Sequence, residues 1–191
     1  MEEPRHLPPA EAPSRWEDFV ALDEDDLREL VDGRLVEIEV PTGLHEWIVV
    51  EVGRHLGNWA HTHRAGFVLG SGYKVRIRHD RGVMPDLQFF RRGRSIPDPG
   101  LDTGAPDLAV EVVSPGSARF DRGTKRAWYA SIGTPEYWLV DPERRTVERL
   151  VLDPGGDYRL AQLARDDGTF VADSCPGLAI PLGELWTIPR P

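Results

Sequence analysis

Two carboxylates stand inside otherwise apolar stretches of the sequence, Asp86 in "VMPDLQFF" and Glu111 in "PDLAVEVVS". Burying an unpaired carboxylate is costly, and a second one nearby adds like-charge repulsion that raises a pKa. If the two segments are adjacent strands, a divalent cation would offset both charges, because Mg²⁺ takes oxygen ligands and is often held by one or two carboxylates. We therefore predict that Asp86 and Glu111 are ligands of Mg²⁺ or Mn²⁺.

A lysine that follows these carboxylates is predicted to point toward them. Lys125, Trp128, Tyr129 and Ile132 lie at i, i+3, i+4 and i+7. The lysine thus begins the apolar stripe of a helix that should face the sheet. A lysine beside a carboxylate-bound metal can orient or activate water and stabilise charge that develops on a phosphate. These are the tasks of phosphodiester hydrolysis.

Each of the three residues also has a structural explanation. Lys125 could extend past Trp128 to solvent, or pair with Asp121 four residues earlier on the helix. Asp86 could be a turn residue after a proline, and Glu111 could lie on a solvated sheet face. Their joint placement on two strands and one helix face favours a catalytic site.

Periodicity and turn residues predict the elements that must position this trio. The Asp-Gly pair at 32–33 lies between two alternating runs and predicts a hairpin over residues 28–40. Apolar spacing predicts a helix over 42–63 and another over 121–133, ending at Gly133. Strands are expected at 72–79, 83–90 and 106–114, followed by a meander over 136–163. This order suits the α/β (α+β) class, with one mixed sheet flanked by helices.

Length and composition favour one globular domain. The chain has 191 residues, of which 40% are hydrophobic and 29% charged, as is usual for folded soluble proteins. Residues 1–15, rich in Pro, Glu and Ala, are predicted as a flexible tail before a single domain of residues 16–191. No apolar stretch approaches the roughly 20 residues that span a bilayer, and the N-terminus lacks the pattern of a signal peptide. We expect a cytoplasmic location, no membrane contact and a structural role for Cys175, which has no cysteine partner.

The net charge of −9 is unevenly distributed along the chain. Residues 1–51 hold 15 acidic and 4 basic side chains, whereas residues 74–126 hold 11 basic and 7 acidic ones. A basic surface around Glu111 could therefore bind nucleic acid, although a solvated surface of mixed charge would give the same pattern. The arginines predicted to contact nucleic acid are Arg76, Arg78, Arg91, Arg92 and Arg94.

The segments "MPDLQFF" and "PDLAVEVVSPGSARFDRGTKRAWYASIGTPEYWLVDP" together resemble the Uma-two family of restriction endonucleases, a branch of the PD-(D/E)XK nuclease superfamily. The resemblance is dense over residues 85–142. It implies a restriction-endonuclease-like core and metal-dependent cleavage of nucleic acid, with Asp86 and Glu111 as metal ligands and Lys125 as the catalytic lysine. In the superfamily pattern the lysine lies two residues after the acidic residue, where this chain has Val113. The resemblance implies that the lysine has moved to the helix.

Two further positions resemble family features, Glu29 in "RELVDG" and His45 in "TGLH". Glu29 would be an extra acidic ligand, and His45 would contact phosphate or water. Otherwise Glu29 would be a hairpin surface residue and His45 would pack at a helix start. "HEWIV" is not an HExxH zinc motif, because Val49 stands where the second histidine is needed.

Three functions follow as hypotheses. The first is a metal-dependent endonuclease that hydrolyses phosphodiester bonds of DNA. The main alternative is a catalytically inactive nuclease-fold module that binds nucleic acid or a protein partner. A third, drawn from the apolar meander and the acidic N-terminal part, is a homodimeric scaffold that does not bind nucleic acid. Cutting both strands of a duplex would be easiest for a symmetric homodimer.

Overall fold

The computed structural model describes residues 12–23 and 26–189. Most of the expected N-terminal tail lies outside these residues. Within the described part, the Ser14 amide donates to the Gly33 carbonyl at 2.9 Å, just before the short helix α1 (Trp16–Val20). The chain is therefore held against the hairpin from Ser14 onward.

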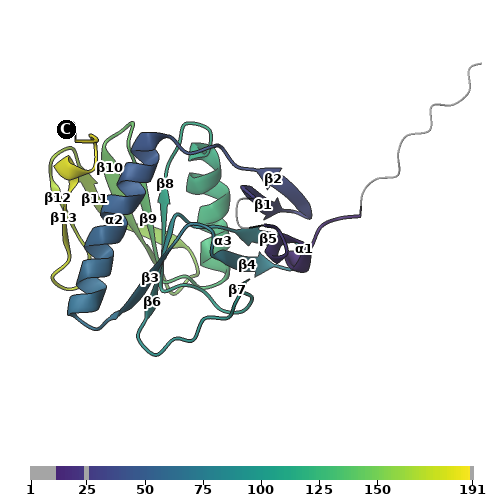
Figure 1. Cartoon of the computed structure of the whole chain (residues 1–191). Helices are drawn as coiled ribbons and strands as arrows, with labels where there is room; N and C mark the ends of the chain where they lie inside the picture. The colour runs from purple at the N-terminus through teal and green to yellow at the C-terminus, as the bar shows by residue number, and fades with distance from the viewer. Residues whose placement is uncertain (1–11, 24–25, 190–191) are drawn as a thin grey trace, which may run out of the picture.

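A six-stranded mixed sheet forms the centre of the fold, in the order β11-β10-β9-β8-β6-β3 (Figure 1). Its strands are β3 (Gly66–Gly70), β6 (Leu87–Arg91), β8 (Leu108–Val112), β9 (Glu136–Asp141), β10 (Thr146–Leu152) and β11 (Tyr158–Arg165). β8 and β9 are parallel, and the other neighbours are antiparallel. The predicted meander is confirmed as β9 to β11, and the mixed α/β class is also confirmed.

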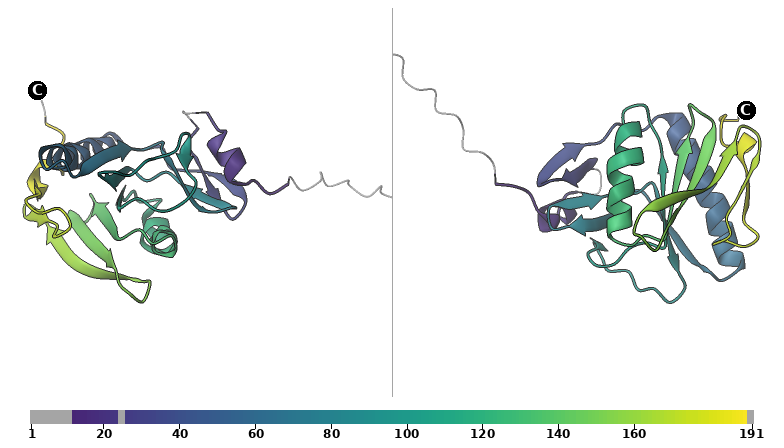
Figure 2. Two further views of the ribbon diagram at one scale, coloured as in Figure 1. Left: turned by 90° about the horizontal axis from the view of Figure 1, so that it is seen from below. Right: turned by 180° about the vertical axis from the view of Figure 1, so that it is seen from behind.

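Helices cover both faces of this sheet. The long helix α2 (Gly43–Thr62) lies on one face, while the π-helical segment η1 (Phe120–Lys125) and the helix α3 (Arg126–Ser131) cover the other (Figure 2). α2 packs Val52 and Leu56 on the apolar residues of β8 that precede and follow Glu111, Val110 and Val112. Because side chains alternate along a strand, Glu111 itself faces η1 and α3.

A second sheet holds the N-terminal hairpin, and β12 (Thr169–Val171) and β13 (Ala179–Pro181) form a small third one, so the expectation of one sheet is corrected to three within the described residues. Its order is β2-β1-β5-β4-β7, and its strands are β1 (Arg28–Val31), β2 (Arg34–Glu37), β4 (Lys74–Arg78), β5 (Arg81–Val83) and β7 (Gly100–Leu101). The hairpin turn has positive φ at Asp32 (47°) and Gly33 (75°), as a two-residue turn of this kind requires.

The chain passes between the two larger sheets at Asp86. The strand expected over 83–90 is present as β6 but begins only at Leu87, and Val83, the first residue of the expected range, ends β5 instead. Pro85 has no amide hydrogen for a ladder and restricts the residue before it, which explains the interruption. Asp86 is the last residue before β6 begins.

The C-terminal part of the chain completes the core beneath α2. It contains β12, β13 and the short helix η2 (Leu182–Glu184). Cys175 is buried there, and burial raises the pKa of its thiol. The sequence did not predict β3, β7, β12 or β13. Among the described residues, no helix combines the length and the apolar character that crossing a bilayer requires.

Candidate active site

Asp86 and Glu111 come from neighbouring strands. The antiparallel register pairs Leu87 with Val110, so the next pair outward sets Asp86 opposite Glu111. The Val112 amide donates to Asp86 Oδ2 at 2.7 Å, which fixes the aspartate against β8. Glu111 is only 3% exposed, in agreement with its place in a buried strand.

Lys125 reaches Glu111 from η1, on the sheet face that Glu111 occupies. Its Nζ lies 3.0 Å from Glu111 Oε1, 3.1 Å from Glu29 Oε1 and 3.8 Å from Asp121 Oδ1. Lys125 is the last residue of η1, and π-helical turns occur frequently at functional sites. Val113, at the lysine position of the superfamily pattern, is instead buried in the core under α3.

Glu29 joins the cluster from the second sheet. It lies on β1 with 1% exposure, and its Oε1 also accepts a hydrogen bond from the Met84 amide at 3.0 Å. The expected alternative of a surface residue on the hairpin does not hold. The two sheets and one helix therefore converge at Lys125.

Sequence reasoning did not identify two members of the cluster as site residues. The Tyr129 hydroxyl donates to Glu111 Oε1 at 2.7 Å, and buried Asp121 faces Lys125. The spacing 121, 125, 129 places these residues one turn apart on one helix face, which is a signal that could have found them. The sequence predicts Asp121 only as a structural partner of Lys125.

Burial and charge act in opposite directions on these groups. Burial raises the pKa of Glu111 well above its usual 4.5, although the Lys125 ammonium opposes the shift. Burial likewise raises the pKa of Asp121. Burial alone would lower the pKa of Lys125, but Glu111, Glu29 and Asp121 outweigh it, and the pKa of the lysine is raised well above 10.5. Lys125 therefore stays charged, and the cluster keeps an excess of acidic groups.

His45 borders the cluster from the first turn of α2. Its Nε2 lies 3.4 Å from Asp86 Oδ2. Burial lowers the pKa of His45, but the hydrogen bond and charge of Asp86 more than compensate and raise it above 6.5. The His45 amide also donates to Thr42 Oγ1, which caps the helix, so His45 lies at the helix start as the alternative expected, while its contact with phosphate or water stays a prediction.

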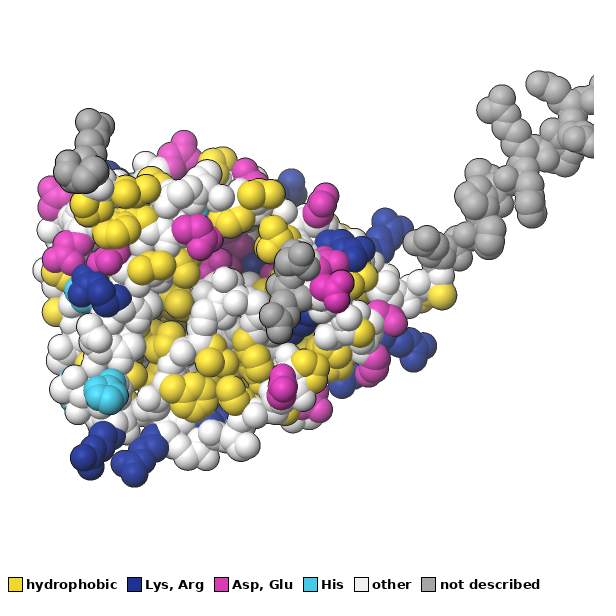
Figure 3. All heavy atoms as spheres, in the orientation of Figure 1, with side chains coloured by type: hydrophobic (Ala, Val, Ile, Leu, Met, Phe, Trp, Pro, Cys, Tyr) yellow, Lys and Arg dark blue, Asp and Glu magenta, His cyan; other side chains and the backbone are white. Residues whose placement is uncertain are grey.

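The cluster opens into a cavity of about 740 Å³ lined by Glu29, His45, Asp86, Glu111 and Lys125, among other residues. In Figure 3, acidic side chains gather around a recess in the upper middle of the visible face. Glu29 Oε2 and Asp121 Oδ1 are buried and have no hydrogen-bond partner among residues 12–23 and 26–189. Such orphaned carboxylate oxygens, in a set of oxygen donors with excess negative charge, fit Mg²⁺ or Mn²⁺.

A second group of possible metal ligands, away from the cluster around Lys125, has its ligand atoms close together. Among the described residues, the ligand atoms of Glu51, His55 and Glu184 lie within 4.8 Å of one another. Arg54 already bonds to both carboxylates, with Nη2 3.2 Å from Glu184 Oε2. This guanidinium supplies the positive charge that a metal ion would provide.

The predicted nucleic-acid arginines do not converge on the carboxylates. Arg91, Arg92 and Arg94 are exposed at the opposite end of β6 from Asp86. Arg76 alternates with Val75 and so shares a face with Lys74, whose ammonium lies over the Phe19 ring of α1. Arg78 is exposed and pairs with Asp80.

Comparisons with known proteins agree with this architecture. A crystal structure described as "a putative nuclease belonging to DUF820", from Anabaena variabilis, aligns with a TM-score of 0.72 at 21% identity, covering 91% of this chain and 98% of that one. No curated protein matches the chain. The model of the Uma2 family, described as "Putative restriction endonuclease", matches residues 16–183. The chain therefore belongs to the Uma2 family.

Proposed function

We propose that this protein is a metal-dependent endonuclease that hydrolyses phosphodiester bonds of DNA. The observation that carries the proposal is the contact of Lys125 with Glu111, opposite Asp86, in a cavity that holds orphaned carboxylate oxygens. Asp86 and Glu111 are the proposed ligands of Mg²⁺ or Mn²⁺, Lys125 the catalytic lysine, and Glu29 and His45 accessory residues. Membership of a nuclease family supports a nucleic-acid substrate.

The charge of each side chain determines its proposed role in phosphodiester hydrolysis. When bound, Mg²⁺ supplies Lewis-acid charge at the phosphate and makes a water molecule more acidic. Lys125 stays protonated because its pKa is raised, so it acts as a hydrogen-bond donor and positive charge rather than as a base. His45, whose pKa is raised by Asp86, can donate to a phosphate oxygen from the cavity rim.

One observation favours the inactive binding module as a second candidate. Lys125 lies within 4 Å of three carboxylates, Glu29, Glu111 and Asp121. Its charge is thus balanced by carboxylates of the protein itself, as it would be in a purely structural ion cluster.

Conversion of supercoiled plasmid to nicked or linear DNA tests the proposal. We expect cutting with Mg²⁺ or Mn²⁺ but not with chelator, and loss of cutting in Glu111→Ala and Lys125→Ala variants that still fold. Glu51→Ala is the matched control, because Glu51 is also a buried glutamate and belongs to the other cluster. If Glu51→Ala abolishes cutting and Glu111→Ala does not, the metal assignment is wrong. If the unaltered protein binds metal but cuts no nucleic acid, the binding module is the better description.

The products of the same reaction test the homodimer. A symmetric dimer that cuts both strands gives linear DNA early, whereas a monomer accumulates nicked circles first. We also propose that the protein acts in the cytoplasm.

A further inference from the structure

A second cavity, of about 720 Å³, adjoins the carboxylate cavity and shares His45 and Ser114 with it. Three arginines that the sequence did not single out contribute to its lining, Arg119, Arg122 and Arg144. We name it the arginine cavity. It has an apolar wall that includes Leu44 and Val113.

Two of its three arginines are available to an anionic ligand. Arg122 is held by Asp141 and Glu148, which balance its charge. Arg119 is exposed and makes no ion pair within residues 12–23 and 26–189. Arg144 has a side chain that is 67% exposed, and its Nε forms a long ion pair with Asp141 Oδ2 at 3.6 Å, a carboxylate that Arg122 already binds. Asp141 and Glu143 also line the cavity, so its arginines outnumber its carboxylates and it keeps an excess of positive charge beside the acidic cluster.

Ser114 and Gly116 lie where the two cavities adjoin, and we name them the ridge. The ridge already binds an anionic group. The Ser114 hydroxyl donates to Glu39 Oε2 at 2.6 Å, and the Gly116 amide donates to the same oxygen at 3.1 Å. Glu39 is exposed and comes from the segment between β2 and α2, remote in sequence from both donors. A phosphate oxygen has the same acceptor chemistry, so it can replace this carboxylate oxygen.

The ridge lies at a suitable distance from the proposed site of hydrolysis. Ser114 follows Glu111 by only three residues, so at most about 10 Å of chain separates them. A strand bound at the site of hydrolysis can therefore place a neighbouring phosphate on the ridge.

We propose that the arginine cavity and the ridge bind the DNA strand next to the phosphate that is cut. Arg119 and Arg144 contact backbone phosphates, and a phosphate displaces Glu39 from Ser114 and Gly116. This inference rests on the proposed function, because it extends the substrate of that site into the neighbouring cavity.

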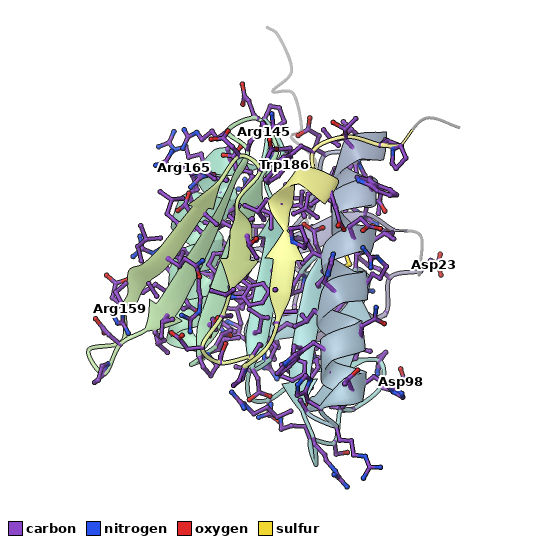
Figure 4. The ribbon with its side chains drawn as sticks, turned by 90° about the vertical axis from the view of Figure 1, so that its left-hand side faces the viewer. Asp23, Asp98, Arg145, Arg159, Arg165 and Trp186 are labelled. Carbon is purple, nitrogen blue, oxygen red and sulfur yellow. The ribbon has the colours of Figure 1, made fainter. Side chains whose placement is uncertain are left out.

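Binding of a short fluorescent DNA duplex, measured in chelator over a series of salt concentrations, tests the inference without cleavage. The double variant Arg119→Ala/Arg144→Ala should bind about tenfold or more weakly, and the slope of log affinity against log salt should fall by about 2. Glu39→Gln should bind several-fold more tightly, because it removes a competing negative charge. The matched control is Arg159→Ala. Arg159 is also exposed, but it lies at the start of β11, far from Arg145, the chain neighbour of Arg144 (Figure 4).

The outcomes separate this inference from the proposed function. If the double variant and Arg159→Ala bind with equal affinity and equal salt slopes, the inference is wrong even if the unaltered protein cuts DNA. If binding depends on Arg119 and Arg144 but no metal supports cutting, the inference stands and the nuclease proposal fails. If the unaltered protein binds neither duplex nor single-stranded DNA, both fail. The thermal midpoint of each variant shows that it is folded.

Discussion

At the scale of single residues, Lys125 is the side chain on which the site depends. Its removal leaves Glu111, Glu29 and Asp121 buried with no counter-charge. We expect Lys125→Met to lower the free energy of unfolding by about 3–5 kcal/mol at neutral pH in chelator. The loss should be smaller in acid, where the carboxylates take up protons. Urea unfolding at two pH values measures both effects.

Lys74→Met is the matched control for that measurement. Lys74 is also buried, but its Nζ donates to a backbone carbonyl, that of Leu22, and burial lowers its pKa. Its replacement should cost about 1 kcal/mol, the value of one hydrogen bond. Equal losses in the two variants would contradict the assigned role of Lys125 as the counter-charge of the cluster.

The sequence predicted part of this site. Asp86, Glu111 and Lys125 were inferred from carboxylates in apolar strands and from one helical stripe, and the structure brings Lys125 into contact with Glu111. Tyr129 looked like an ordinary stripe residue, because its apolar ring hides a hydroxyl that reaches Glu111. The arginines could not be placed, because charge counts along a chain do not say which sheet face or end a side chain occupies.

At the scale of elements, local signals succeeded where they were strong. The Asp-Gly pair at 32–33 predicts the hairpin turn, and the apolar stripe over 42–63 predicts α2. The turn residues of the meander predict the boundaries between β9, β10 and β11. The strand expected over 83–90 begins later than predicted, because one proline between two apolar runs separates it from β5. The π-helical form of η1 leaves no mark in the apolar spacing, although it sets the positions of Asp121 and Lys125.

Two glycines test the account of the elements. A Cβ added to Gly123 in η1 meets nothing within 4 Å, so Gly123→Ala should raise the free energy of unfolding by up to about 1 kcal/mol. At Gly66 in β3, φ is 157° and an added Cβ would lie 1.9 Å from the Phe90 carbonyl oxygen. Gly66→Ala should therefore destabilise by several kcal/mol. Thermal unfolding of the two variants compares them, and equal midpoints would contradict the described geometry.

At the scale of the whole molecule, the site joins parts that are otherwise separate. Glu29 belongs to the five-stranded sheet, Glu111 to the six-stranded sheet and Lys125 to the helical segment that covers it. The apolar patterns of the sequence predict the individual strands and the helix. They do not predict that the two sheets and the helical segment meet at Lys125, because this depends on how the chain crosses between the sheets at Asp86. The acidic excess at this junction couples the stability of the fold to pH and to metal.

The pKa of Glu111 determines whether stability rises or falls with pH. Because burial raises its pKa, the folded state binds this proton more tightly than the unfolded state does. Its contribution to stability is thus complete below its usual pKa of 4.5 and is lost as pH rises through the raised value. In chelator, Glu111→Gln should therefore gain stability relative to the unaltered protein as pH rises toward about 8.

A divalent cation should reverse the order of stability of the two proteins at high pH. It binds the deprotonated carboxylate of Glu111, which forms as the pH rises. Saturating Mg²⁺ or Mn²⁺ should raise the thermal midpoint of the unaltered protein more at about pH 8 than at about pH 5.5, since protons compete with the metal for Glu111. Glu111→Gln lacks this charge and should show little or no shift. An equal metal-induced shift in the two proteins would place the cation elsewhere, and the cluster of Glu51, His55 and Glu184 would then be the next site to test.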